Sequence, residues 1–121
     1  MDYNSTVEWL KKYKIDYDKC IYIRNAMTGL KAISYTEKLG KKKTINEYME
    51  DLIELNNEMA VIEETINSIT DHKSRLVVAY RYLQFKTYDE IGEIMHYSTV
   101  YIRKIHKKGI KSITKYRELS L

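Results

Sequence analysis

The chain of 121 residues contains no proline, and only four of its residues are glycine. A helix tolerates these two residues least, because proline lacks an amide hydrogen and glycine loses the most conformational freedom. Almost nothing in the sequence therefore opposes helix, and few positions suit the turns of a loop-rich enzyme. The length corresponds to one domain, or to one small domain with an extension. We expect an all-α protein.

Charge is distributed unevenly along the chain. The net charge of +4 combines +2 in residues 1–40, −4 in residues 41–70 and +6 in residues 71–121. The stretch from His96 to Arg117 holds seven basic residues and no acid. A local excess of this kind indicates an anionic partner, and a solvated basic surface is the alternative interpretation.

Several classes of protein are disfavoured by what the sequence lacks. No apolar run approaches the roughly 18 residues of a membrane span, and no apolar core of a secretory signal follows the first residues. We therefore expect a cytoplasmic protein that does not bind membrane. The single cysteine, Cys20, excludes a disulfide framework and a cysteine-rich zinc site. Because Cys20 lies on an apolar helical stripe, we expect it to be a buried small side chain.

Residue types that carry catalysis are present but are not arranged for it. The three histidines, His72, His96 and His106, lack the i, i+4 spacing of a helical metal site. Neighbouring acids such as Glu63 and Glu64 splay apart on a helix and make a poor acid–base pair. The sequence contains no glycine-rich phosphate loop and no Ser/His/Asp arrangement. We expect no cofactor, no metal and no enzymatic activity.

Two helix-start signals open the N-terminal half, each with a hydroxyl residue followed three residues later by glutamate. The first signal, Ser5–Glu8, predicts a helix to about Ile33. The second signal, Thr44–Glu47, follows a connection at residues 34–43 that contains three consecutive lysines. The N-terminal half is therefore expected to hold two long helices.

The second of these helices has an apolar seam. Between Ile45 and Ile69 apolar residues recur about every 3.4 residues, which is close to the period of a coiled coil. We predict an antiparallel hairpin with the first helix over residues 1–69, and pairing with a second copy of the chain, as a homodimer, is the alternative. The outer face of the second helix is acidic, which disfavours nucleic acid as its ligand; its acids are Glu47, Glu50, Asp51, Glu54 and Glu58.

Three shorter helices are expected in residues 70–121. Asp71 caps a helix that ends at about Gln84, Thr87–Glu90 begins a short helix, and Ser98 begins the last one. The last two are joined by a tight turn and share an apolar face, with a glycine where their backbones approach; this set is Ile91, Gly92, Met95, Tyr97, Ile102 and Ile105. The pattern is that of a helix-turn-helix, whose second helix lies in the major groove of DNA.

Burying Ile102 and Ile105 leaves one face of the last helix exposed. Arginine can bind guanine through two hydrogen bonds, threonine and valine methyl groups can contact thymine, and lysines can meet phosphates. Lys115 and Arg117, further along, are also expected at phosphates. The expected DNA-binding residues are Ser98, Thr99, Val100, Tyr101, Arg103, Lys104, Lys107, Lys108 and Lys111. Tyrosines of this half could instead stack on single-stranded bases, but packing in the core is the interpretation that we favour.

The same stretch resembles a known family. Thr87–Ser98 is similar to the opening of region 4 of primary-type bacterial sigma factors, roughly T-L-E-E-I-G, five residues, then S or T. Ile102–His106 resembles the I-R-Q-I-E of that family, and Asp71–Tyr82 resembles its preceding helix. The whole arrangement is similar to small phage or prophage regulators of the ArpU and RinA type, which implies a role in the control of late transcription.

Three positions depart from the family pattern. His96 stands where the family usually has glycine, and histidine is among the residues that best tolerate a positive φ. Thr99–Tyr101 replaces a charged R-E-R, so recognition of an ordinary −35 element is not implied. Gly109 stands where alanine is usual, which weakens an interior helix position by about 1 kcal/mol.

The expected function is that of a sequence-specific transcriptional regulator that binds double-stranded DNA. Two alternatives remain open. Sigma-like domains also dock on RNA polymerase, so the chain could be a protein–protein module. Small terminase subunits of phages also join a helix-turn-helix to an oligomerising helical region, so a DNA-packaging component is the other alternative.

Overall fold

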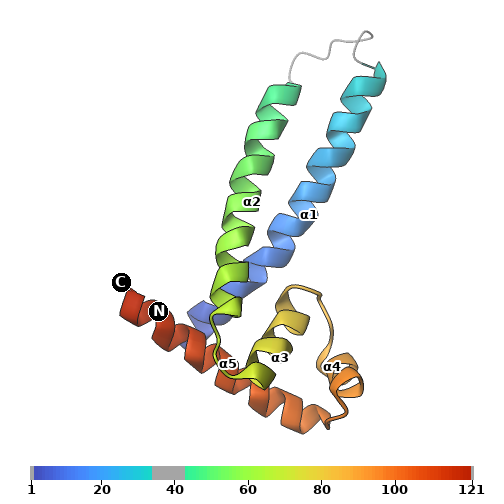
Figure 1. The fold of residues 1–121 in the computed structure, drawn as a ribbon. Coiled ribbons are helices and arrows are strands. Elements are labelled where there is room, and N and C mark those ends of the chain that lie inside the picture. The colour runs from blue at the N-terminus through green and yellow to red at the C-terminus, as the bar shows by residue number, and fades with distance from the viewer. Residues whose placement is uncertain (1, 34–42, 121) are drawn as a thin grey trace.

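In a computed structural model, which describes residues 2–33 and 43–120, the chain forms an all-α fold. The described residues form five helices, as the helix-start signals and the apolar spacing predict: α1 (Tyr3–Ile33), α2 (Ile45–Asn67), α3 (His72–Tyr82), α4 (Tyr88–Met95) and α5 (Thr99–Ser120). A long antiparallel hairpin of α1 and α2 stands on a base of three helices, with α5 running along the bottom (Figure 1). The predicted fold class is confirmed.

The start of α1 differs from the prediction. The helix begins at Tyr3, because Asp2 acts as its cap and accepts a hydrogen bond from the Ser5 backbone N–H at 2.7 Å. The predicted capping box at Ser5–Glu8 is therefore wrong. Thr6 lies inside the helix and is buried, and its hydroxyl shares a 2.6 Å hydrogen bond with Thr114 of α5.

The start of α2 agrees with the prediction. The Glu47 N–H donates to Thr44 Oγ1 at 3.1 Å, and the Thr44 N–H donates to Glu47 Oε1 at 2.9 Å, which completes a capping box. Most of the predicted connection, residues 34–42, lies outside the described residues. The apolar seam of α2 is covered by α1 of the same chain, where Leu52 packs with Cys20 and Ile23. Cys20 is buried, as predicted.

The hairpin and the base share one core at their junction. Residues from both parts pack together there: Leu10, Tyr13, Ile62, Ile66, Ile69, Val78, Tyr82, Ile110 and Ile113. On the outside of this junction the Arg117 guanidinium lies 3.8 Å from the centre of the Trp9 ring. The hairpin is thus joined to the C-terminal half of α5, and these contacts leave the first half of α5 to a different core.

That second core holds the helix-turn-helix together. Val77, Ile91, Ile102 and Ile105 are buried in it, and Tyr80, Tyr88, Met95 and Tyr97 pack around them. The predicted apposition of α4 and α5 is confirmed. The predicted caps of α3 and α4 are confirmed too, since Asp71 accepts from the Ser74 N–H and Thr87 accepts from the Glu90 N–H. None of the described helices is both long enough and apolar enough to cross a membrane.

Candidate nucleic-acid interface

The turn between α4 and α5 is tight and depends on two residues. His96 adopts φ 63° and ψ 44°, the left-handed conformation that glycine favours and that histidine tolerates better than most side chains. The Tyr97 N–H donates to the Gly92 carbonyl at 2.9 Å and closes the turn. A Cβ on Gly92 would lie 2.7 Å from the Tyr97 carbonyl oxygen, so the backbones approach as closely as the sequence predicts.

The first turn of α5 is fixed by two side chains. Ser98 Oγ accepts from the Tyr101 N–H at 3.2 Å, so Ser98 caps the helix as predicted. The Thr99 hydroxyl donates to Asp89 Oδ1 of α4 at 2.6 Å. This hydrogen bond already occupies the hydroxyl of Thr99, which is half-buried, and leaves its methyl group as the part suited to an apolar contact.

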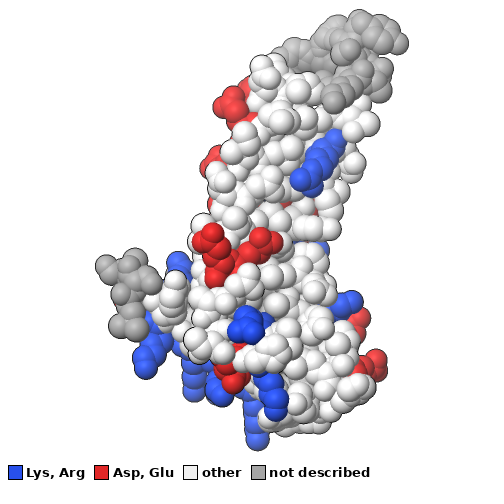
Figure 2. Space-filling model, viewed as in Figure 1, with Lys and Arg blue, Asp and Glu red and all other residues white. Residues whose placement is uncertain are grey.

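One face of α5 is exposed and basic. Val100 is 66 % exposed and Tyr101 is 39 % exposed, whereas Ile102 and Ile105 are buried on the opposite side. The lysines and the arginine predicted on this face are all exposed: Arg103, Lys104, Lys107, Lys108 and Lys111. Lysine and arginine side chains gather along the lower edge of the molecule, where α5 lies (Figure 2). The described part of the hairpin stands on the other side of the base, away from this edge (Figure 1).

Arg103 lies against an aromatic ring at the edge of this face. Its guanidinium is 4.8 Å from the centre of the Tyr88 ring, and the guanidinium of Arg81 is 4.4 Å from the same ring. Arg81 also donates to the Lys86 carbonyl at 3.1 Å. Sequence reasoning missed Arg81 and Tyr88, because nothing in the local pattern places the end of α3 and the start of α4 beside Arg103. This cation–π contact orders Arg103 before any ligand binds.

On the opposite side of α5 lies a second cation that sequence reasoning missed. Lys73 Nζ of α3 is 5.1 Å from the centre of the Tyr97 ring and 6.0 Å from that of Tyr101. Two residues before Lys73, Asp71 Oδ1 lies 3.7 Å from Lys108 Nζ of α5. Both contacts form because the start of α3 crosses α5, and the spacing of residues along the sequence does not predict this crossing.

His106 is polar but belongs to the core. It is 5 % exposed, and its Nε2 shares a 2.7 Å hydrogen bond with the Tyr82 hydroxyl. Burial, and secondly the charge of Arg81, lower the pKa of His106 to about 4, so the ring is neutral at pH 7. Burial also raises the pKa of Tyr82. His106 therefore adds no charge to the basic face, and Tyr82 is a core residue, as the packing interpretation of the tyrosines predicts.

These geometries agree with the comparison of the sequence with family models. Residues 71–115 match the family model Sigma-70, region 4. The matched segment comprises α3, α4 and most of α5, and it is a sigma region 4-like helix-turn-helix. At the level of the family, the match supports a DNA-binding module without catalytic activity. Searches of curated proteins and of solved structures found no match to the chain.

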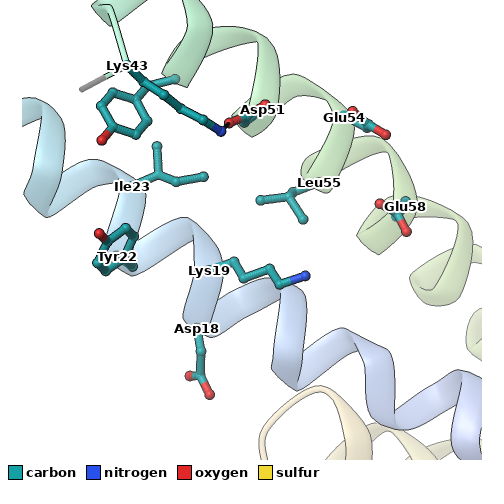
Figure 3. A pocket seen from close by; sticks show the side chains of 10 residues that line it. Asp18, Lys19, Tyr22, Ile23, Lys43, Asp51, Glu54, Leu55 and Glu58 are labelled. Atoms are coloured by element: carbon teal, nitrogen blue, oxygen red, sulfur yellow. Dashed lines mark hydrogen bonds and ion pairs between the residues drawn. The ribbon is translucent and has the colours of Figure 1, made fainter. Parts of the chain in front are cut away.

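The hairpin offers a different surface from the sigma region 4-like module. An open pocket lies between α1 and α2, with side chains of both helices along it (Figure 3). Four carboxylates and two lysines line it: Asp18, Asp51, Glu54, Glu58, Lys19 and Lys43. Lys43 Nζ binds Asp51 Oδ2 at 2.6 Å. The excess of negative charge makes this pocket unsuitable for nucleic acid, but Asp51, Glu54 and Glu58, which were predicted on the outer face of α2, line the pocket beside α1. Within the described ranges, no group of three or more histidine, cysteine or acidic side chains could hold a metal ion.

Proposed function

We propose that the protein is a sequence-specific transcriptional regulator that binds double-stranded DNA with α5 in the major groove. The observation that carries this proposal is the exposed basic face of α5, opposite the buried Ile102 and Ile105, in the segment that matches sigma region 4. A helix presented in this way by a helix-turn-helix has the shape and charge that the major groove accepts.

The residues of this face divide by chemistry. Arg103 is suited to guanine, whose O6 and N7 accept two hydrogen bonds from a guanidinium. Val100 and the methyl group of Thr99 are suited to the methyl group of thymine, with Ser98 and Tyr101 beside them. The lysines are suited to phosphates and contribute affinity rather than specificity; they are Lys104, Lys107, Lys108 and Lys111. Arg117 suits this role less, because its guanidinium packs on Trp9.

The biological setting is proposed on the resemblance of the whole arrangement. A helical hairpin over residues 1–69, followed by a sigma region 4-like domain over residues 70–121, is similar to phage or prophage regulators of the ArpU and RinA type. We therefore place the protein in the cytoplasm of a bacterium, as a phage- or prophage-encoded regulator.

Selection of bound duplexes from a random pool tests binding and specificity together. With the selected duplex, Arg103→Ala should cost about 1–3 kcal/mol of binding free energy and relax the preference at one base pair. Lys107→Ala should weaken selected and random duplexes equally, and Lys19→Ala on the hairpin provides a control of the same charge change. If Arg103→Ala weakened binding to the selected and the random duplexes equally, Arg103 would contact a phosphate and would not read a base.

One observation favours a second role for the hairpin. Its acid-lined pocket is suited to a basic protein surface, and sigma-like domains also dock on RNA polymerase. A pull-down that recovers RNA polymerase while gel shifts detect no DNA complex would favour this role over DNA binding.

Light scattering tests the remaining alternative, a DNA-packaging component. It distinguishes a monomer or a homodimer from the many-membered ring expected of a small terminase.

A further inference from the structure

The first turn of α3 carries a lysine that belongs to neither helix of the helix-turn-helix pair but lies beside α5. Lys73 is exposed, and its ammonium lies over the rings of Tyr97 and Tyr101, at 5.1 and 6.0 Å from their centres. The two rings meet edge to face, with their centres 4.9 Å apart. Two ring faces therefore hold the cation at one place, which reduces the conformational freedom that it would lose on binding.

The position of Lys73 relative to the exposed face of α5 follows from helix geometry. Successive residues of a helix are about 100° apart, so Tyr101 and Arg103 lie on opposite sides of Ile102, the buried centre of the face that packs on the core. Lys108, seven residues after Tyr101, lies on the Tyr101 side. The major groove is about 12 Å wide and a helix with its side chains is about 10–12 Å across, so each side of α5 would face one sugar–phosphate strand.

The electrostatic surroundings leave Lys73 available for an anion. The carboxylate of Asp71, two residues before Lys73, accepts hydrogen bonds from the Ser74 backbone and hydroxyl and pairs with Lys108 at 3.7 Å. A lysine ammonium is charged throughout the neutral range at its ordinary pKa, and the hydrogen bond with Tyr97, followed by the nearby Tyr101, raises the pKa of Lys73 further. Among the described residues, the ion pair at the start of α3 joins Asp71 to Lys108 and does not involve Lys73.

We infer that Lys73 is a further DNA contact, which binds a backbone phosphate on the strand facing the Tyr101 side of α5. The inference rests on the proposed function and extends the interface from the helix-turn-helix pair to α3. Since a phosphate carries no base identity, Lys73 contributes affinity and orientation but no sequence preference. Arg103, ordered by Tyr88 on the other side of α5, faces the opposite strand.

The test compares Lys73→Gln with Lys19→Gln, which makes the same charge change at an exposed site on the hairpin. Binding to the selected duplex is measured by fluorescence anisotropy from about 50 to about 200 mM salt. Loss of one phosphate contact reduces the slope of log K against log salt by about 0.9, so the advantage of the wild type should be about 3.5-fold larger at the low salt than at the high salt. Lys73→Arg should restore the wild-type slope, and thermal melting should show that all variants fold.

The outcomes separate the inference from the function on which it rests. Equal slopes for Lys73→Gln and Lys19→Gln, with a wild type that binds, would overturn the phosphate contact and leave the proposed function intact. A loss that depends on the duplex sequence would also overturn it, because Lys73 would then read a base. A wild type that binds no duplex would instead overturn the proposed function itself.

Discussion

Gly109 gives a prediction whose sign depends on tertiary structure. Helix propensity alone predicts that Gly109→Ala stabilises α5 by about 1 kcal/mol. In the structure, however, a Cβ on Gly109 would lie 2.7 Å from Val78 Cγ2 and 3.4 Å from the Ser74 carbonyl oxygen. Carbon atoms in contact are normally about 3.5–4.0 Å apart, so the new methyl group would push α3 and α5 apart or force Val78 to move.

Val78 has little freedom to move. It is fully buried, and a β-branched side chain in a helix strongly prefers one rotamer. Overpacking of this kind costs about 1–3 kcal/mol. Set against the gain of about 1 kcal/mol from propensity, the expected net effect of Gly109→Ala is a loss of about 1 kcal/mol in the free energy of unfolding, or about 4 °C in Tm.

A double-mutant cycle isolates the contact. Val78→Ala alone should cost about 2 kcal/mol by leaving a cavity, but in that background the second change, Gly109→Ala, should now stabilise the protein by about 1 kcal/mol. The expected coupling energy is therefore about 2 kcal/mol, measured by urea denaturation of the four proteins. If Gly109→Ala stabilised both backgrounds by the same amount, the close approach of α3 and α5 at this glycine would be refuted.

Three further predictions concern the turn and the buried histidine. Because the folded pKa of His106 is about 4 and the unfolded one about 6.5, the unfolded chain takes up the proton first as pH falls; the wild type should lose about 3 kcal/mol of stability between pH 6.5 and 4. In urea titrations over that pH range, His106→Gln should lose less free energy of unfolding than the wild type. His72→Gln, a control at an exposed site, keeps His106 and should lose as much as the wild type. If the free energies of unfolding of the two variants fell equally with pH, the burial argument would be contradicted. His96→Gly should be more stable than His96→Ala by about 1 kcal/mol, since alanine pays more for the left-handed conformation; equal midpoints in urea would argue against that strain. Gly92→Ala should lower stability by about 2–3 kcal/mol and abolish duplex binding, because its Cβ meets a backbone oxygen, and unchanged melting and gel shifts would disprove the tight turn.

Much of the fold follows from interactions between residues close in sequence. Caps such as Thr44 and Thr87 are predictable because a hydroxyl and a glutamate three residues later satisfy each other's backbone groups. Apolar spacing likewise predicts which side of α5 is buried, because helix geometry alone decides which residues share a face with Ile102. The one cap predicted wrongly is Ser5. Asp2 caps α1 instead, because its carboxylate accepts a hydrogen bond from a backbone N–H of the first turn and the helix begins earlier.

The surroundings of the candidate interface could not be predicted in this way. Arg103 is predicted on the exposed face, and it is exposed, but its contact with Tyr88 joins α5 to the start of α4 at the edge of that face. Lys73 carries no local signal at all, because its place beside Tyr101 depends on how α3 crosses α5. Such contacts depend on how close two helices come in space, and the spacing of apolar residues along the sequence gives no information about that distance.

The amino-acid order by itself determined where helices form, which of their sides are apolar and where positive charge accumulates, because each of these is set within a few residues along the chain. Only the packed structure decided how near α3 comes to α5, and hence that Gly109 must lack a side chain and that Lys73 borders the basic face. The physical reason is that close packing is a property of pairs of surfaces, and the two surfaces that meet here lie about thirty residues apart in the chain.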